Sequence, residues 1–88
     1  GAAVRPVYEI AAPAFDKITI HLDQRYYAGE KFVIEAENNS PENCYIQSAT
    51  LNGKQLDKCW FYHSEFAKGG ELKLKLGGEP NKDWGSKP

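Results

Sequence analysis

Apolar and polar residues alternate with a period of two in three segments of the chain, at residues 17–22, 31–37 and 71–76. The apolar positions are Ile18, Ile20 and Leu22, then Phe32, Ile34 and Ala36, then Leu72, Leu74 and Leu76. Because successive side chains of a β-strand point to opposite faces, each segment predicts a strand with one buried face. Most intervening positions carry Lys, Thr, His or Glu, which indicates an antiparallel sheet whose second face contacts water.

Short segments rich in Gly, Asn and Ser separate these strands, and no segment has the periodicity of a long helix. One helical turn is predicted within residues 63–70, where Ser64 is a candidate N-cap and Gly69 or Gly70 a candidate stop. Residues 5–15 predict an edge strand broken at Pro13. The fold predicted for residues 1–88 is a single all-β domain, a small antiparallel β-sandwich of about six to seven strands. Residues 1–4 are interpreted as a tag or linker and residues 77–88 as an extended tail.

The dipeptide Asn52-Gly53 predicts a β-hairpin with a two-residue type I′ turn. Counting back from that turn gives the pairs Leu51 with Lys54, Ile46 with Cys59, and Cys44 with Phe61. Cys44 and Cys59 are then diagonal neighbours, about 7 Å apart and at the limit of disulfide geometry. We therefore expect two free thiols and no structural disulfide.

The composition of the chain excludes several classes of partner. Eleven basic residues face 12 acidic residues, so the formal net charge is only −1. The electrostatic field of a chain with so small a net charge does not favour binding to nucleic acid or to an acidic membrane. No apolar run approaches the ~20 residues of a membrane span, so we expect no membrane insertion. The chain begins at Gly1 and contains no Met, and we interpret it as a piece of a longer protein.

Candidate catalytic and metal-binding groups are present but lack the expected context. Cys44, Cys59 and His63 do not have the paired spacing of zinc ligands, and a fourth ligand would have to be His21 or a carboxylate. A Cys–His nucleophile likewise lacks any feature that would activate the thiol. Glu35 and Glu37 share the exposed face of one predicted strand, where water surrounds them. We predict no catalytic residue and no metal site.

Aromatic residues are the strongest candidates for binding. Three consecutive aromatics, residues 60–62, alternate between the two faces of a strand, so at least one points inward. Two uses remain open for Trp84, Trp60, Tyr26 and Tyr27: docking onto another domain, or stacking on sugar rings. Docking is favoured, with Trp84 as its first candidate, because a Gly- and Pro-rich tail offers no alternation that would carry this ring into the core.

Several motifs, in their order and spacing, resemble one enzyme family. They are "NNSPENCYIQSATLNGK" at residues 38–54, the spacing W-x2-H-x5-GG-x-L from Trp60 to Leu72, and the closing "EPNKDWG" at residues 79–85. Together they resemble the C-terminal part of glycoside hydrolase family 92, the calcium-dependent α-1,2-mannosidase-like enzymes. The resemblance extends from Tyr8 to Gly85, nearly the whole chain.

The resemblance implies an inverting mannosidase built from an N-terminal β-sandwich and an (α/α)6 barrel. It places calcium and the catalytic carboxylates upstream of this segment, so we expect no cofactor here. It implies a non-catalytic domain that supports the barrel, and an extracytoplasmic location, either periplasmic or secreted. The alternative is a carbohydrate-binding module that recognises mannose-containing glycans.

Overall fold

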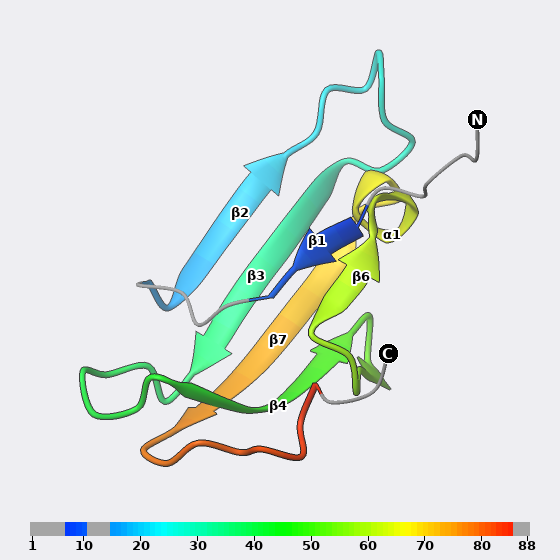
Figure 1. Cartoon of the computed structure of the whole chain (residues 1–88). Helices are drawn as coiled ribbons and strands as arrows, with labels where there is room; N and C mark the ends of the chain where they lie inside the picture. Colours follow the sequence, from blue (N-terminus) through cyan, green and yellow to red (C-terminus); the bar gives the residue numbers. More distant parts are fainter. Residues whose placement is uncertain (1–6, 11–14, 86–88) are drawn as a thin grey trace.

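Two β-sheets packed face to face form the domain (Figure 1). The computed structural model describes residues 7–10 and 15–85. The larger sheet has the strand order β2-β3-β7-β4-β5 and the smaller sheet pairs β1 with β6. The elements are β1 (Val7–Glu9), β2 (Lys17–His21), β3 (Lys31–Glu37), β4 (Tyr45–Leu51), β5 (Lys54–Gln55), β6 (Trp60–Tyr62), α1 (His63–Ala67) and β7 (Gly70–Gly77). The prediction of a small β-sandwich of about seven strands is confirmed.

The central pair of the larger sheet, β3 and β7, is parallel, whereas the sequence predicted antiparallel pairing throughout. Ile34 pairs with Leu72 and Ala36 with Leu74, so the apolar positions of both strands share one face. β7 also pairs antiparallel with β4, where Ala49 lies opposite Leu74. A parallel pair needs a long crossover, and here the chain between β3 and β7 supplies it with β4, β5, β6 and α1.

The core lies between the two sheets. Its buried cluster consists of Phe32, Ala36, Ala49, Phe61, Leu72, Leu74 and Leu76. The predicted alternation is therefore confirmed for β7, whereas in β3 Val33, on the face opposite Phe32, is also buried. β2 differs, because it is the edge strand of the larger sheet and Ile18 remains 36% exposed. Pro13, the predicted break in the first strand, lies outside the described residues.

The predicted turn is confirmed, but the hairpin that follows it is shorter than predicted. Asn52 and Gly53 have φ values of 53° and 82°, as a type I′ turn requires, and Leu51 pairs with Lys54. β5 ends at Gln55, and the chain leaves the larger sheet after Leu56, whose N–H still donates to the Ala49 carbonyl at 2.9 Å. The pairing of Ile46 with Cys59 and of Cys44 with Phe61 is thus wrong. Phe61 pairs with Tyr8 on β1 and packs on Phe32 from the second sheet, and one strand cannot occupy both layers.

Cys44 and Cys59 are free, exposed thiols, which agrees with the prediction that they form no structural disulfide. The two residues are nevertheless not the diagonal neighbours in one hairpin that the sequence predicted.

The predicted helical turn is present as α1, with a different start. Tyr62 is its N-cap, without a side-chain capping bond, so the assignment of Ser64 as the cap is wrong and this residue lies inside the helix. The helix follows directly from β6, which leaves no loop residue free to cap it. Gly69 ends the helix as predicted: its φ is 77° and its N–H donates to the Phe66 carbonyl at 2.9 Å.

Gly29 offers a test of how the β2–β3 loop packs on α1. Its N–H donates to the Ala67 carbonyl at 3.0 Å, and a Cβ built on it would overlap the backbone of Lys68 and Gly69. We expect Gly29→Ala to lower the free energy of unfolding by about 1 to 3 kcal/mol, the usual cost of overpacking.

Urea denaturation of the 88-residue chain measures this effect. Gly78→Ala is the matched control, because the nearest atom to a Cβ there is a carbonyl oxygen at 3.4 Å. The control should change stability by less than about 1 kcal/mol. Equal midpoints for the two variants would show that the loop does not pack on α1.

Candidate functional site

The four aromatic candidates lie at three separate places. Tyr26 and Tyr27 are in the loop between β2 and β3, Trp60 is on β6, and Trp84 follows β7. Tyr26 and Tyr27 are close only because they are neighbours in the chain. Trp60 and Trp84 lie elsewhere, and each has its own set of contacts.

The Tyr26 side chain is held outward by a loop with many internal hydrogen bonds. The Asp23 carbonyl accepts from the N–H groups of Tyr26 and Tyr27, both at 2.9 Å. The Gln24 side-chain amide spans the loop and donates to the Gly29 carbonyl at 2.6 Å. Tyr26 is 77% exposed, the highest value among the exposed large hydrophobic residues of the described chain. The hydrogen-bonded loop backbone thus presents the Tyr26 ring to solvent.

Arg25 and Asp23 add a charged contact to the same loop. Their shortest side-chain contact is an Nη2–Oδ2 ion pair of 2.7 Å, and the Arg25 guanidinium carbon lies 5.5 Å from the centre of the Tyr26 ring. The hydrogen bond from the Arg25 side chain, followed by that from its backbone, lowers the pKa of Asp23 below its ordinary value. Because its pKa is lowered, the ionised Asp23 carboxylate stabilises the folded chain. This stabilisation is present above the ordinary carboxyl pKa and is lost as the pH falls through the lowered value.

Tyr27 faces the protein. Its ring centre lies 6.0 Å from that of His63 and 6.1 Å from that of Phe66. The Tyr8 hydroxyl is 2.7 Å from His63 Nδ1, and the Tyr8 ring packs 5.3 Å from Phe66. Tyr27 therefore belongs to an aromatic cluster that joins its loop to α1 and β1, and its ring is not a free platform.

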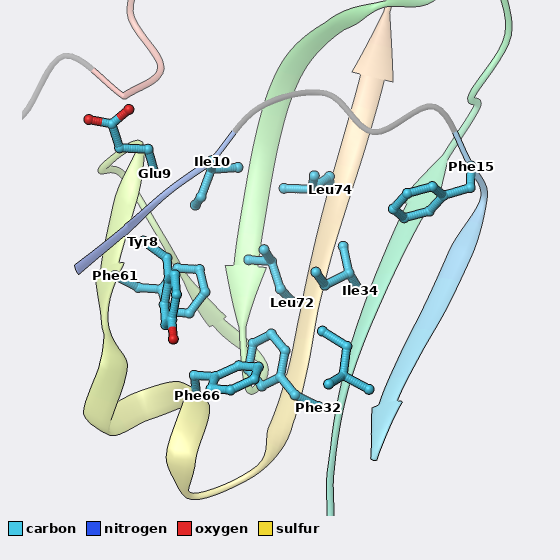
Figure 2. A pocket seen from close by; sticks show the side chains of 11 residues that line it. Tyr8, Glu9, Ile10, Phe15, Phe32, Ile34, Phe61, Phe66, Leu72 and Leu74 are labelled. Atoms are coloured by element: carbon cyan, nitrogen blue, oxygen red, sulfur yellow. The ribbon is translucent and has the colours of Figure 1, made fainter. Parts of the chain in front are cut away.

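An apolar cleft of about 490 Å³ opens between the two sheets (Figure 2). It is lined by Tyr8, Glu9, Ile10, Phe15, Ile20, Phe32, Ile34, Phe61, Phe66, Leu72 and Leu74. Glu9 carries the one charged side chain of this lining, and Figure 2 shows its carboxylate turned away from the apolar side chains. Exposed apolar surface surrounds the cleft, because Tyr8, Phe15 and Ile18 are 39%, 43% and 36% exposed.

The position of the smaller sheet explains why this cleft exists. Figure 1 shows β1 and β6 crossing the middle of the larger sheet, whereas β2 lies at its end. Ile18 pairs with Ile34 and Ile20 with Phe32, so β2 and β3 present a continuous apolar face at that end. The described residues cover it only in part.

A second groove, of about 590 Å³ and mixed character, lies between the β4–β5 hairpin and β6 with α1. Its lining consists of Leu51, Asn52, Lys54, Gln55, Leu56, Asp57, Lys58, Trp60, Phe61, Tyr62, Glu65 and Lys68. The rings of Trp60 and Tyr62 meet edge to face with centres 5.1 Å apart, and the Lys58 ammonium lies 4.8 Å from the centre of the Trp60 ring. We call this groove, defined by those residues, the Trp60 groove.

Trp84 is half-buried and packs against the core cluster. Its indole N–H donates to the Leu56 carbonyl at 2.9 Å, and Asn81 Oδ1 accepts from the N–H groups of Asp83 and Trp84 at 3.0 and 3.3 Å. Gly77 belongs to β7, and the residues after it fold back toward Lys58, which bridges to Gly85. The expectation that nothing carries Trp84 inward is therefore wrong, because an Asn-centred turn and one hydrogen bond do so.

Sequence reasoning missed the cleft residues Tyr8, Phe15 and Ile20 and the contribution of Lys58 to the Trp60 groove. Alternation did predict an apolar face for Ile18 and Ile20, but only the pairing order shows that β2 is at an edge. Among residues 7–10 and 15–85 there is no group of three or more His, Cys, Asp or Glu side chains placed to hold a metal ion. Within the same residues, no helix has the length and apolar character needed to cross a membrane.

The chain is similar to several glycosidases and mannosidases. Residues 2–78 match the family model described as "Glycosyl hydrolase family 92 catalytic domain". An uncharacterized secreted glycosidase of Arthroderma benhamiae is 38% identical over 82 residues, which are 91% of this chain and 10% of that protein. A GH92 inverting mannosidase from Bacteroides thetaiotaomicron superposes with a TM-score of 0.84 at 37% identity, covering 96% of this chain and 11% of that one.

A second mannosidase from Bacteroides thetaiotaomicron, a family GH92 α-mannosidase, superposes with a TM-score of 0.82 at 27% identity. That likeness covers 92% of this chain and 10% of the mannosidase. The chain thus spans about a tenth of the length of each of these relatives.

The environment of Trp84 predicts that this residue stabilises the domain. We expect Trp84→Ala to lower the free energy of unfolding by about 2 kcal/mol, less than the 3–5 kcal/mol typical of fully buried Trp→Ala changes, because the ring is half-buried. Chemical denaturation of the 88-residue chain measures the loss. Tyr26→Ala is the control, and its stability should stay within about 0.5 kcal/mol of the parent value. A Trp84→Ala variant as stable as that control would return Trp84 to the list of docking residues.

Proposed function

Because the chain belongs to glycosyl hydrolase family 92, we propose that it is the non-catalytic, C-terminal β-sandwich domain of an α-1,2-mannosidase. Its role is to support the catalytic (α/α)6 barrel of the same enzyme. The relatives' lengths support this proposal, since about nine tenths of each lies outside the region that this chain covers.

The main support for this proposal is the apolar cleft. Exposed apolar surface that is continuous over several side chains marks a place where another surface packs. The cleft combines exposed Tyr8 and Phe15 with the partly covered face of β2 and β3, and exposed Ile18, which pairs with the lining residue Ile34, extends that face beyond it. Beyond it, Tyr26 projects from a hydrogen-bonded loop, and Tyr side chains are enriched among the residues that dominate interfaces. We propose that the barrel packs on this end of the domain.

The chemistry of the cleft supports a non-catalytic role. Inverting glycosidases use two carboxyl groups about 6.5–9.5 Å apart, one as acid and one as base. Glu9 is the one carboxylate that lines the cleft, and it points away from the apolar side chains. The likeness to a family model named for its catalytic domain is consistent with this role, because the chain matches a small part of much longer enzymes.

The family resemblance implies calcium. On the proposed function, the rest of the enzyme binds this ion. Ca²⁺ takes about 6–8 oxygen ligands, and the described residues hold no cluster of three or more carboxylate, thiol or imidazole groups. We also propose an extracytoplasmic location, periplasmic or secreted, which the secreted glycosidase relative supports.

Glycan recognition is a second candidate function, favoured by the Trp60 groove. That groove combines an indole ring with amide, ammonium and carboxylate groups, the mixture with which proteins bind polar ligands that also have an apolar face.

Hydrolysis tests the non-catalytic role. The purified 88-residue chain is expected to release no chromophore from 4-nitrophenyl α-mannoside, with added calcium or with a chelator, because the barrel would supply the reacting groups. The full-length enzyme is the positive control. Turnover by the isolated chain would contradict the proposed function.

Docking through the exposed loop has a separate test in the full-length enzyme. Tyr26→Ala should leave the stability of the 88-residue chain within about 0.5 kcal/mol. In the full-length enzyme it should lower the melting temperature, because there the ring loses a contact that the isolated domain does not make. Tyr45→Ala is the matched control, since Tyr45 is also exposed, at 42%, but lies on β4, which β7 separates from the β2 and β3 end of the sheet. A lower melting temperature for Tyr45→Ala alone would place the docking surface elsewhere.

A further inference from the structure

We propose that the Trp60 groove binds a neutral oligosaccharide, with the indole of Trp60 as the surface on which a sugar ring stacks. The choice of a mannose oligosaccharide as ligand rests on the proposed function, whereas the site itself rests on the geometry of the groove.

Strand alternation on β6 creates the aromatic part of the site. Phe61 is buried in the core, so its neighbours Trp60 and Tyr62 leave the opposite face of the strand. Their rings meet at 77° with centres 5.1 Å apart, which makes a corner of two aromatic surfaces. A pyranose ring has an apolar face of C–H groups and a rim of hydroxyls, so a corner of this kind covers the apolar face and leaves the rim free.

Polar groups surround that corner with both donors and acceptors. The groove is lined by the ammonium groups of Lys54, Lys58 and Lys68, the carboxylates of Asp57 and Glu65, and the amide of Gln55. The Gln55 amide nitrogen donates to Asp57 Oδ1 at 2.7 Å, which orients both side chains. Sugar hydroxyls both donate and accept, and three cations beside two anions give no strong preference for a polyanion. The lining therefore fits a neutral glycan.

The Lys58 ammonium contacts the indole ring of Trp60 and can be replaced there by a sugar ring. The ammonium lies 4.8 Å from the centre of the Trp60 ring, a cation–π contact on a side chain that is partly exposed. Such contacts are weak at solvent-accessible positions. A stacking sugar displaces the ammonium from the ring, and the flexible lysine stem keeps it within reach of the sugar hydroxyls.

Comparison of the Trp60 groove with the apolar cleft favours a soluble glycan, and not a protein surface, as the ligand of the groove. The buried centres of protein interfaces are depleted in charged residues. The apolar cleft meets that condition with a single carboxylate, whereas five charged side chains line the Trp60 groove. A protein covering the groove would have to pair or desolvate all of them, and a hydroxylated ligand satisfies them while water remains present.

Titration of linear α-1,2-linked mannotriose into the ¹⁵N-labelled 88-residue chain tests the proposal by NMR. The sequence contains two tryptophans, so two indole N–H signals are expected, and Trp60→Phe assigns them. The Trp60 signal should move with added sugar, and by more than that of Trp84, whose indole N–H donates to the carbonyl of Leu56 at the edge of the lining. Because the parent chain itself reports the contact, the result does not depend on a variant that folds poorly.

Variants sharpen the result. Trp60→Ala should weaken mannotriose binding about tenfold or more, equal to at least 1.4 kcal/mol, and Trp60→Phe should retain part of the affinity. Tyr45→Ala is the matched control, because Tyr45 is exposed and lies outside the groove lining, and this variant should stay within about twofold of the parent Kd. Thermal unfolding confirms that each variant is folded.

Three outcomes would overturn the proposal. One is the absence of any shift at about 10 mM mannotriose, well above the Kd of a weak 1 mM ligand. Another is a set of shifts confined to the Tyr26 loop. The third is movement of the Trp60 signal with protein concentration in the absence of sugar, which would make the groove a contact between copies. None of these outcomes touches the docking test with Tyr26→Ala, so the two proposals fail separately.

Discussion

The packing of Phe61 against Phe32 holds the two sheets together, and most other features of the domain depend on it. The ring centres lie 5.7 Å apart with an interplanar angle of 15°, and Phe32 has no exposed surface. A two-stranded sheet of three-residue strands is not stable alone in water, so β1 and β6 depend on this contact for their place. The alternation that turns Phe61 inward also turns Trp60 and Tyr62 outward. One packing interaction therefore builds the core and creates the Trp60 groove.

Local rules predicted those parts of the fold that depend on residues close in sequence. The apolar faces of β3 and β7, the turn at Asn52-Gly53 and the end of α1 at Gly69 each follow from a periodicity or a backbone preference within a few residues. The partners of the strands do not follow in that way. The parallel pairing of β3 with β7 depends on where β4 and β6 pack, and the local pattern of β6 is the same in either sheet.

The same distinction explains which candidate residues were placed correctly from sequence. Three consecutive aromatics on one strand must alternate, and Phe61 is indeed the inward one. Trp84 was misplaced because its burial comes from a turn around Asn81 and from the Leu56 carbonyl, 28 residues away along the chain. The cleft was not predicted because it arises from a difference in width between two sheets, a quantity that no single strand carries.

The apolar cleft and the Trp60 groove differ in the sign of the free-energy change when another protein surface covers them. Covering the apolar cleft removes hydrophobic surface from water, which is favourable by about 25 cal/mol per Å². Covering the Trp60 groove with a dry surface would bury ammonium and carboxylate groups, which is unfavourable unless each one finds a partner. A larger enzyme that contains this domain would therefore be most stable with the cleft inward and the groove outward. The orientation on the barrel that we propose follows from the domain's own surface chemistry, and it leaves Trp60 on the solvent side, where a glycan can reach it.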